Sequence, residues 1–180
     1  MIYFTSDWHI DETRITKEFN PFFRPFSSIS EQNQIILNNA KAIIKSQDVL
    51  YHLGDVSMTI DGIACIDQIK CASKHLIIGN YDEDKIGFLA KHFDTVSFSK
   101  YVELSNGFQV FCTHYPASAM EQSSFGIVGH IHGLWKVQPN MINVSVDAWH
   151  FKPVSEDEII FAMHGIKNHY DKNVFPYCPK

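Results

Sequence analysis

The chain has few cysteines, no excess of basic residues and no long hydrophobic run. Its cysteines form no Cys-X-X-Cys pair, which favours reduced thiols in a cytoplasmic protein; they are Cys65, Cys71, Cys112 and Cys178. Lysine and arginine number 15 against 20 aspartates and glutamates, and the net charge of −5 argues against an extended nucleic-acid footprint. No segment approaches the length of a membrane span, and no basic, apolar leader opens the chain, so we expect no membrane partner.

The length of 180 residues and the hydrophobic content of 45% suit one domain, residues 1–180, with a sizeable core. Hydrophobic periodicity predicts strands at 2–6, 49–53, 75–78, 102–104, 108–112, 125–128 and 141–146. It also predicts a helix that opens at Ser30 and further helices at 63–69, 84–91 and 156–165. Residues 10–29 are predicted to form a long irregular loop, which in a compact domain is usually functional.

The order of these elements predicts the fold class. Strands alternate with helices in the first half of the chain, and the second half is rich in strands with a hairpin signal at Ser105-Asn106-Gly107. This order predicts a layered α/β domain, with a single doubly wound sheet as the alternative.

A metal-ligating side chain follows the end of several predicted strands. Open α/β sheets place their ligands at this position, just beyond the carboxyl ends of the strands. The set is too large for one tetrahedral site and has about the right size for two metal ions that share a carboxylate. Its members are Asp7, His9, Asp55, Asn80, His114, His130 and His132.

Each of these motifs is weak when taken alone. Asp7 and His9 are alternate residues that would share one face of a strand, and Gly-Asp and Gly-Asn are ordinary turn dipeptides. The Gly129–His132 cluster is sharper, because it brings two imidazoles to one side of an extended segment. The joint occurrence of all the motifs, in this order, favours a shared metal site.

The motifs resemble the signature of the calcineurin-like metallophosphoesterases. The resemblance rests on Asp7-X-His9, Gly54-Asp55, Gly79-Asn80-X-Asp82, His114 and Gly129-His130-X-His132, and it covers most of the chain. Three further stretches are similar to a compact bacterial and phage branch of that family: Arg24-Pro25-Phe26-Ser27, residues 143–147 and residues 152–155.

The resemblance implies two packed mixed β-sheets flanked by helices, with two divalent metal ions at one edge. By motif, Asp7, His9 and His132 would hold one metal, Asn80, His114 and His130 would hold the other, and Asp55 would bridge them. A hydroxide between the metals would then hydrolyse a phosphomonoester or phosphodiester in a small phosphorylated substrate. Mixed imidazole, carboxylate and amide ligands suit Mn, Fe, Zn or Ni better than Mg or Ca.

Four residues near these motifs have more than one interpretation. Tyr81 stands where the family usually carries a histidine, and it would either donate to the leaving oxygen or only pack beside the site. Arg24 would either bind a phosphate with both arms of its guanidinium or be a solvated loop residue. We expect His52 to be structural, and Asp147 to be structural or to support a ligand from behind.

Two other functions compete with a phosphoesterase. A degenerate scaffold of the same fold would bind another protein with weak or no catalysis, and the loss of the usual histidine at Tyr81 favours it. The complete set of chemically competent ligands argues against such a scaffold. A nuclease of this fold would need a basic strip, which this acidic chain does not show.

Overall fold

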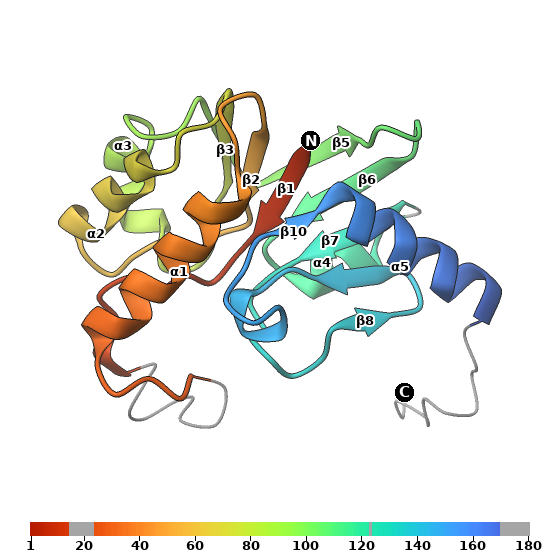
Figure 1. Cartoon of the computed structure of the whole chain (residues 1–180). Helices are drawn as coiled ribbons and strands as arrows, with labels where there is room; N and C mark the ends of the chain where they lie inside the picture. The colour runs from red at the N-terminus through yellow and green to blue at the C-terminus, as the bar shows by residue number, and fades with distance from the viewer. Residues whose placement is uncertain (15–23, 123, 170–180) are drawn as a thin grey trace.

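Two five-stranded β-sheets form the centre of the protein (Figure 1). The structure is a computed structural model, and it describes residues 1–14, 24–122 and 124–169. The first sheet has the strand order β10-β1-β2-β3-β4. Strands β1 to β4 are parallel, and only β10 runs antiparallel to its neighbour. The bounds are Ile2–Thr5 (β1), Val49–His52 (β2), Ser73–Ile77 (β3), Thr95–Ser97 (β4) and Val154–Ser155 (β10).

The second sheet has the strand order β5-β6-β7-β9-β8. Strands β6, β7 and β9 are parallel, whereas β5 and β8 are antiparallel to their neighbours. The predicted hairpin joins β5 to β6, and Gly107 takes the positive φ of 81° in its turn. The bounds are Ser99–Glu103 (β5), Gln109–Thr113 (β6), Phe125–Val128 (β7), Val137–Gln138 (β8) and Met141–Asn143 (β9). The single-sheet alternative is therefore wrong, and the layered α/β prediction with two mixed sheets is confirmed.

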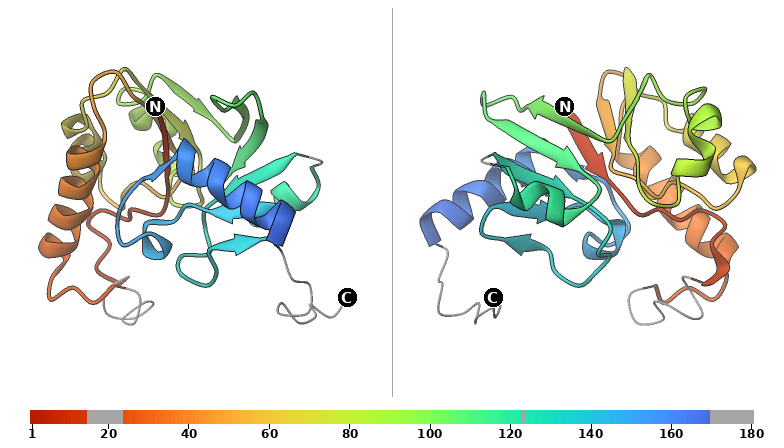
Figure 2. Two further views of the ribbon diagram at one scale, coloured as in Figure 1. Left: turned by 45° about the vertical axis from the view of Figure 1, so that its right-hand side comes forward. Right: turned by 180° about the vertical axis from the view of Figure 1, so that it is seen from behind.

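Helices flank the two sheets. Helices α1, α2 and α3 lie together on one side of the molecule, and α5 lies on the other (Figures 1 and 2). Helix α1 begins after Ser28, whose side chain accepts a hydrogen bond from the N–H of Glu31, and not at Ser30 as predicted. The bounds are Ile29–Ile43 (α1), Ile60–Ala64 (α2), Ile86–Leu89 (α3), Pro116–Met120 (α4) and Glu156–His169 (α5).

The side-chain alternation of the strands builds two hydrophobic layers. In β2 and β3, Leu50 and Leu76 face the layer under helices α1 to α3, whereas Tyr51 and Ile77 face the second sheet. Residues of the second sheet, such as Ile127, complete that inner layer. Burying one aliphatic side chain of this size stabilises a fold by about 1.5–3 kcal/mol, so these layers fix how the sheets meet.

Several predicted elements differ from the structure in their extent. The strand predicted at 141–146 ends at Asn143, because the chain then turns into a 3-10 helix at Val146–Ala148. The helix predicted at 84–91 is a 3-10 turn followed by the single turn of α3. Strands β4, β8 and β10 and helix α4 were not predicted, because segments of two to five residues show little periodicity. The part of the predicted loop at 15–23, and Cys178, lie outside the described residues.

Among the described residues, no helix combines the length and the apolar character that crossing a membrane requires.

Candidate metal centre

All seven predicted ligands lie at one edge, where the carboxyl ends of parallel strands from both sheets meet. Asp7 and His9 follow β1, Asp55 follows β2, and Asn80 follows β3. From the second sheet, His114 directly follows β6, and His130 and His132 follow β7. This is the position at which open α/β sheets place ligands.

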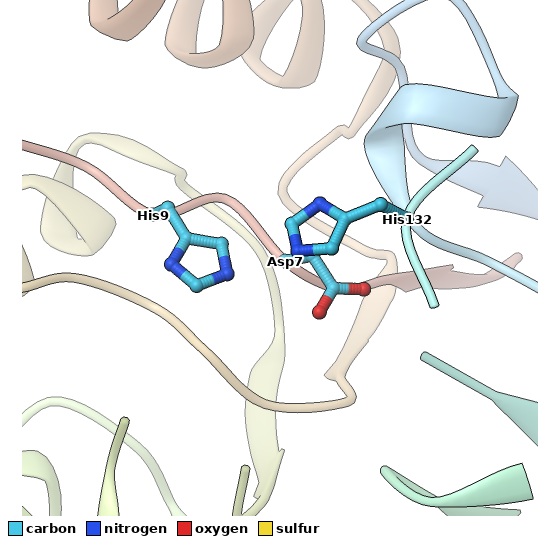
Figure 3. A group of neighbouring side chains, drawn as sticks. All are labelled: Asp7, His9 and His132. Atoms are coloured by element: carbon cyan, nitrogen blue, oxygen red, sulfur yellow. The ribbon is translucent and has the colours of Figure 1, made fainter. Parts of the chain in front are cut away.

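Asp7, His9 and His132 form the first group, with ligand atoms that all lie within 4.8 Å of one another. Figure 3 shows these side chains gathered together, although His132 comes from a different sheet. The rings of His9 and His132 are stacked with centroids 5.1 Å apart. His9 is only 1% exposed, and neither of its ring nitrogens has a hydrogen-bond partner among the described residues. A buried imidazole without hydrogen bonds is costly, and a cation at this position would satisfy it.

Asn80, His114 and His130 form the second group, a triangle of three donor atoms. His114 Nε2 and His130 Nδ1 each lie 3.1 Å from Asn80 Oδ1, and the two nitrogens are 3.2 Å apart. His114 Nδ1 lies 2.7 Å from the carbonyl of Leu53, which can only accept, so Nδ1 is the donor there and Nε2 faces the triangle. Donor atoms around a metal with bonds of about 2.1 Å are separated by roughly 3.0–3.4 Å, so this spacing fits coordination.

Asp55 lies between the two groups. Its Oδ2 atom is 3.4 Å from His9 Nε2 and 3.5 Å from His114 Nε2. Its Oδ1 atom accepts the N–H of Tyr81 at 2.9 Å. Burial alone would raise the pKa of Asp55, but the neighbouring His9 and His114 outweigh it and lower the pKa to about 2. Asp55 is therefore an ionised carboxylate with one oxygen turned toward both groups.

The backbone is strained at most of the predicted ligands. Five of the seven have a positive φ, which few non-glycine residues adopt: Asp7 (57°), His9 (46°), Asp55 (59°), His130 (74°) and His132 (51°). Each such residue costs of order 1–3 kcal/mol, and strain of this kind concentrates at functional sites. The rest of the fold must hold these side chains in place against that cost.

Close contacts between loops supply part of this support. The hydroxyl of Ser6 donates to Asp7 Oδ2 at 2.6 Å, and the N–H of His130 reaches both oxygens of Asp7 at 3.1 Å. A Cβ atom at Gly129 would lie 2.5 Å from Ser6 Oγ, so only glycine lets the two loops approach this closely. The first group is thus held from both sheets at once.

The fully buried Asp82 joins the loops after β2 and β3. Its carboxylate accepts the N–H groups of Asp55, Val56 and Gly79 at 2.8 to 3.1 Å. Burial raises its pKa, since three backbone donors only partly compensate for the loss of water and the charge of Asp55. Asp82 is the last residue of the Gly-Asn-X-Asp motif, and no role for it follows from the sequence.

Both sequence interpretations of Arg24 are wrong. Its side chain is fully buried and binds Asp147 with two hydrogen bonds, from Nε at 2.7 Å and from Nη2 at 2.8 Å. The guanidinium also donates to the carbonyls of Trp8 and Asp7. Arg24 is therefore neither solvated nor directed at a substrate. Its role is to hold the segment that carries Asp7 and His9.

Asp147 connects this arginine to a predicted ligand. Its Oδ2 atom lies 2.8 Å from His132 Nδ1, which turns His132 Nε2 toward the first group. Burial alone would raise the pKa of Asp147, but Arg24 and His132 outweigh it and hold the pKa far below its usual range. Asp147 therefore supports a predicted ligand from behind, one of the two interpretations that its sequence position allowed.

Tyr81 and His52 pack against different aromatic rings near the predicted ligands. The partly buried Tyr81 ring packs edge-on against the ring of His9, with centroids 4.9 Å apart. His52 is fully buried and packs edge-on against Trp8 and Phe93. Burial lowers the pKa of His52 to about 3, so His52 is a neutral residue of the core.

Together these features define a layered α/β protein with a candidate metal centre at the convergent ends of its strands. No protein-family model matches the chain. It is 30% identical over 169 residues to uncharacterized protein MJ1445 of Methanocaldococcus jannaschii, a match that covers 88% of this chain and 89% of that protein. The chain belongs to the family of MJ1445.

The fold is also similar to a solved structure. The crystal structure of AQ665 from Aquifex aeolicus, a protein of unknown function, matches with a TM-score of 0.74 and 29% sequence identity. The match covers 89% of this chain and 98% of that one.

Proposed function

We propose that this protein is a metal-dependent phosphoesterase with the fold of the calcineurin-like metallophosphoesterases. The observation that carries the proposal is the position of Asp55, whose Oδ2 atom lies about equally far from His9 and His114 in the two ligand groups. The closeness of Asp7, His9 and His132 to one another, and of Asn80, His114 and His130 to one another, supports the proposal.

The residues fit two metal ions with Asp55 as the bridge. Asp7 is the competing bridge, because it also lies within 4.8 Å of ligand atoms of Asp55 and His114. Both oxygens of Asp7, however, already accept hydrogen bonds from Ser6 or from the N–H of His130. Asp55 Oδ2 instead faces an imidazole on each side, which is the arrangement that a shared ligand needs.

Bound there, two divalent ions would supply an activated water and would neutralise the charge of a phosphoryl group. The residues of the chain orient the ligands and leave the site open on one side. His9 and Asp7 are buried, whereas Asn80 and His130 are exposed, so a substrate would approach over the second group. We infer a small phosphorylated substrate, since the net charge of −5 does not favour a long polyanion.

The experiment is metal analysis of the purified protein together with a screen of phosphate monoesters and diesters in Mn²⁺ and Ni²⁺. We expect hydrolysis that a chelator abolishes and that returns when metal is restored. Asp55→Asn should abolish hydrolysis without unfolding the chain. Asp61→Asn is the matched control, since Asp61 is an exposed carboxylate in the first turn of α2. Full activity of a metal-loaded Asp55→Asn protein, or hydrolysis that persists in chelator, would contradict the proposal.

A scaffold that works by binding another protein predicts a different result from the same screen. Such a protein would hydrolyse neither monoesters nor diesters under any metal, even with its metal content verified. That outcome would overturn the phosphoesterase proposal.

A further inference from the structure

Asn143, the last residue of β9, is fully buried beside the loop 129–136 that carries His130 and His132. The mechanism proposed above does not use it. Its backbone pairs with Val128 at the end of β7, so both residues stand where the ladder between these two parallel strands ends. Beyond Val128 the loop leaves the sheet, and its backbone carbonyls need donors of another kind.

The side-chain amide of Asn143 supplies these donors at two points of the loop. Nδ2 donates to the carbonyl of His132 at 2.6 Å and to the carbonyl of Trp135 at 2.7 Å. Oδ1 accepts the N–H of Ser145 at 3.0 Å, which fixes the direction in which the amide points. Both polar atoms of this buried side chain therefore have partners. A buried amide whose hydrogen bonds are all made specifies one arrangement of the groups around it.

The backbone of Asn143 is itself held in place. Its N–H donates to the carbonyl of Lys136 at 3.0 Å, and its carbonyl accepts the indole N–H of Trp149 at 2.7 Å. Together with the pairing to β7, these bonds make Asn143 a fixed point of the second sheet. The far end of the loop 129–136 is attached to that point.

The near end of the loop has anchors that do not involve Asn143. The N–H of Gly129 donates to the carbonyl of His114 at 3.1 Å. The N–H of His130 reaches both carboxylate oxygens of Asp7 at 3.1 Å. The position of His130 is therefore set by contacts on its own side of the loop.

His132 depends on Asn143 for the position of its backbone. It has a φ of 51°, a conformation that persists in a histidine only where the surroundings hold it. Asp147 orients the ring through Nδ1, whereas Asn143 holds the carbonyl of the same residue. Without the second contact, the backbone of His132 is free to relax to an unstrained φ, and the ring then leaves its place beside His9.

We propose that Asn143 is a positioning residue for the metal ion of the first group, and that it acts by holding the backbone of His132. The inference rests on the metal centre of the proposed function. Asn143 touches neither the ion nor a substrate. It keeps His132 close enough to Asp7 and His9 for the three side chains to bind one ion together. The ion of the second group does not depend on it.

The test measures Mn²⁺ affinity in two backgrounds that each keep one group complete. His114→Ala breaks the second group, and His132→Ala breaks the first. Asn143→Asp keeps the size of the side chain and the acceptor for Ser145, but it replaces both N–H donors with an oxygen. We expect Asn143→Asp to lower the affinity about 10–100-fold in the His114→Ala background, the usual cost of losing a group that orients a ligand. In the His132→Ala background the change should be less than twofold, whereas general damage to the fold would lower both affinities.

A second variant and a matched control accompany this comparison. Asn143→Ser adds no charge, and its single hydroxyl hydrogen cannot serve two carbonyls, so it should show the same selective loss. Asn39→Asp is the matched control, because Asn39 Nδ2 also donates to carbonyls of a segment with positive φ, those of Phe151 at 2.9 Å and His150 at 3.5 Å. That segment carries no predicted ligand, so Asn39→Asp should change Mn²⁺ affinity less than twofold in both backgrounds. Far-UV circular dichroism verifies that each protein is folded.

These measurements need no turnover, so they separate the inference from the proposed function. A selective loss in a protein that hydrolyses no ester would refute the phosphoesterase proposal and leave the role of Asn143 standing. Equal losses in the two backgrounds, or an unchanged affinity in the His114→Ala background, would overturn the inference alone. So would a His114→Ala protein with no Mn²⁺ site, or unfolding of both Asn143 variants. Wild type that binds no metal would overturn both proposals.

Discussion

The two arginine–carboxylate pairs beside the candidate metal centre have the same chemistry and opposite surroundings. On the buried side, Arg24 and Asp147 are both fully enclosed. On the open side, Arg14 is 42% exposed while its partner Glu12 is buried. A desolvated pair is committed to one geometry, because separating it leaves an uncompensated charge, whereas a solvated arginine can exchange its partners for water or ligand. The buried pair therefore holds two predicted ligands, Asp7 and His132, in place, whereas the geometry of the open pair is easier to change.

The largest expected effect is on stability. Arg24→Met should destabilise the protein by about 3–5 kcal/mol, because it leaves Asp147 buried without its partner and two backbone carbonyls without a donor. Arg14→Met should destabilise the protein less, because the guanidinium of this pair is exposed and water can replace it at one side of Glu12. Unfolding curves of both variants in chelator measure this difference. Equal destabilisation by the two substitutions would remove the distinction between the sides.

The pH dependence of stability should reveal the burial of His52. The pKa of His52 is lowered to about 3 in the folded protein, so between pH 6.5 and pH 3 the unfolded chain binds more protons. Stability should therefore fall as pH is lowered through this window. From pH 6.5 to pH 4 the contribution of His52 amounts to about 3 kcal/mol.

His52→Leu should remove that contribution and flatten the curve. The measurement is the free energy of unfolding in urea at several pH values, in chelator, for wild type and variant. His164→Leu is the matched control, since it removes an exposed histidine of α5. A slope that is the same in wild type and His52→Leu would refute the assignment of His52 as a neutral core residue.

Metal affinity should distinguish the two carboxylates. Asp147→Asn weakens the hydrogen bond that orients His132, and the loss of such a supporting carboxylate typically lowers metal affinity about 10–100-fold. Glu12→Gln should leave metal affinity within a factor of two, because the Glu12 carboxylate accepts its hydrogen bonds from Arg14. Competition with a chromogenic chelator measures both affinities. Equal losses in the two variants would show that the open side also supports the metals.

The strands that precede the predicted ligands can be predicted from the sequence better than the groups that hold those ligands in place. Strand β7 was predicted with its observed bounds, because alternating and continuous hydrophobic runs are local signals. The pairing of Arg24 with Asp147 could not be predicted, since the two residues are 123 positions apart and only the folded chain brings them together. The same holds for Asp82, whose partners are backbone N–H groups that carry no sequence signal.

The most direct test of the account is the number and coupling of metal ions in Mn²⁺-loaded protein. We predict two Mn²⁺ per chain and an electron paramagnetic resonance spectrum of an exchange-coupled pair, since a shared carboxylate holds two ions about 3.5–4 Å apart. Asp55→Asn should abolish the coupled signal, whereas Asp61→Asn should leave it unchanged. One Mn²⁺ per chain with the hyperfine pattern of an isolated ion, or a coupled pair that survives in Asp55→Asn, would contradict the claim that Asp55 joins two metal sites.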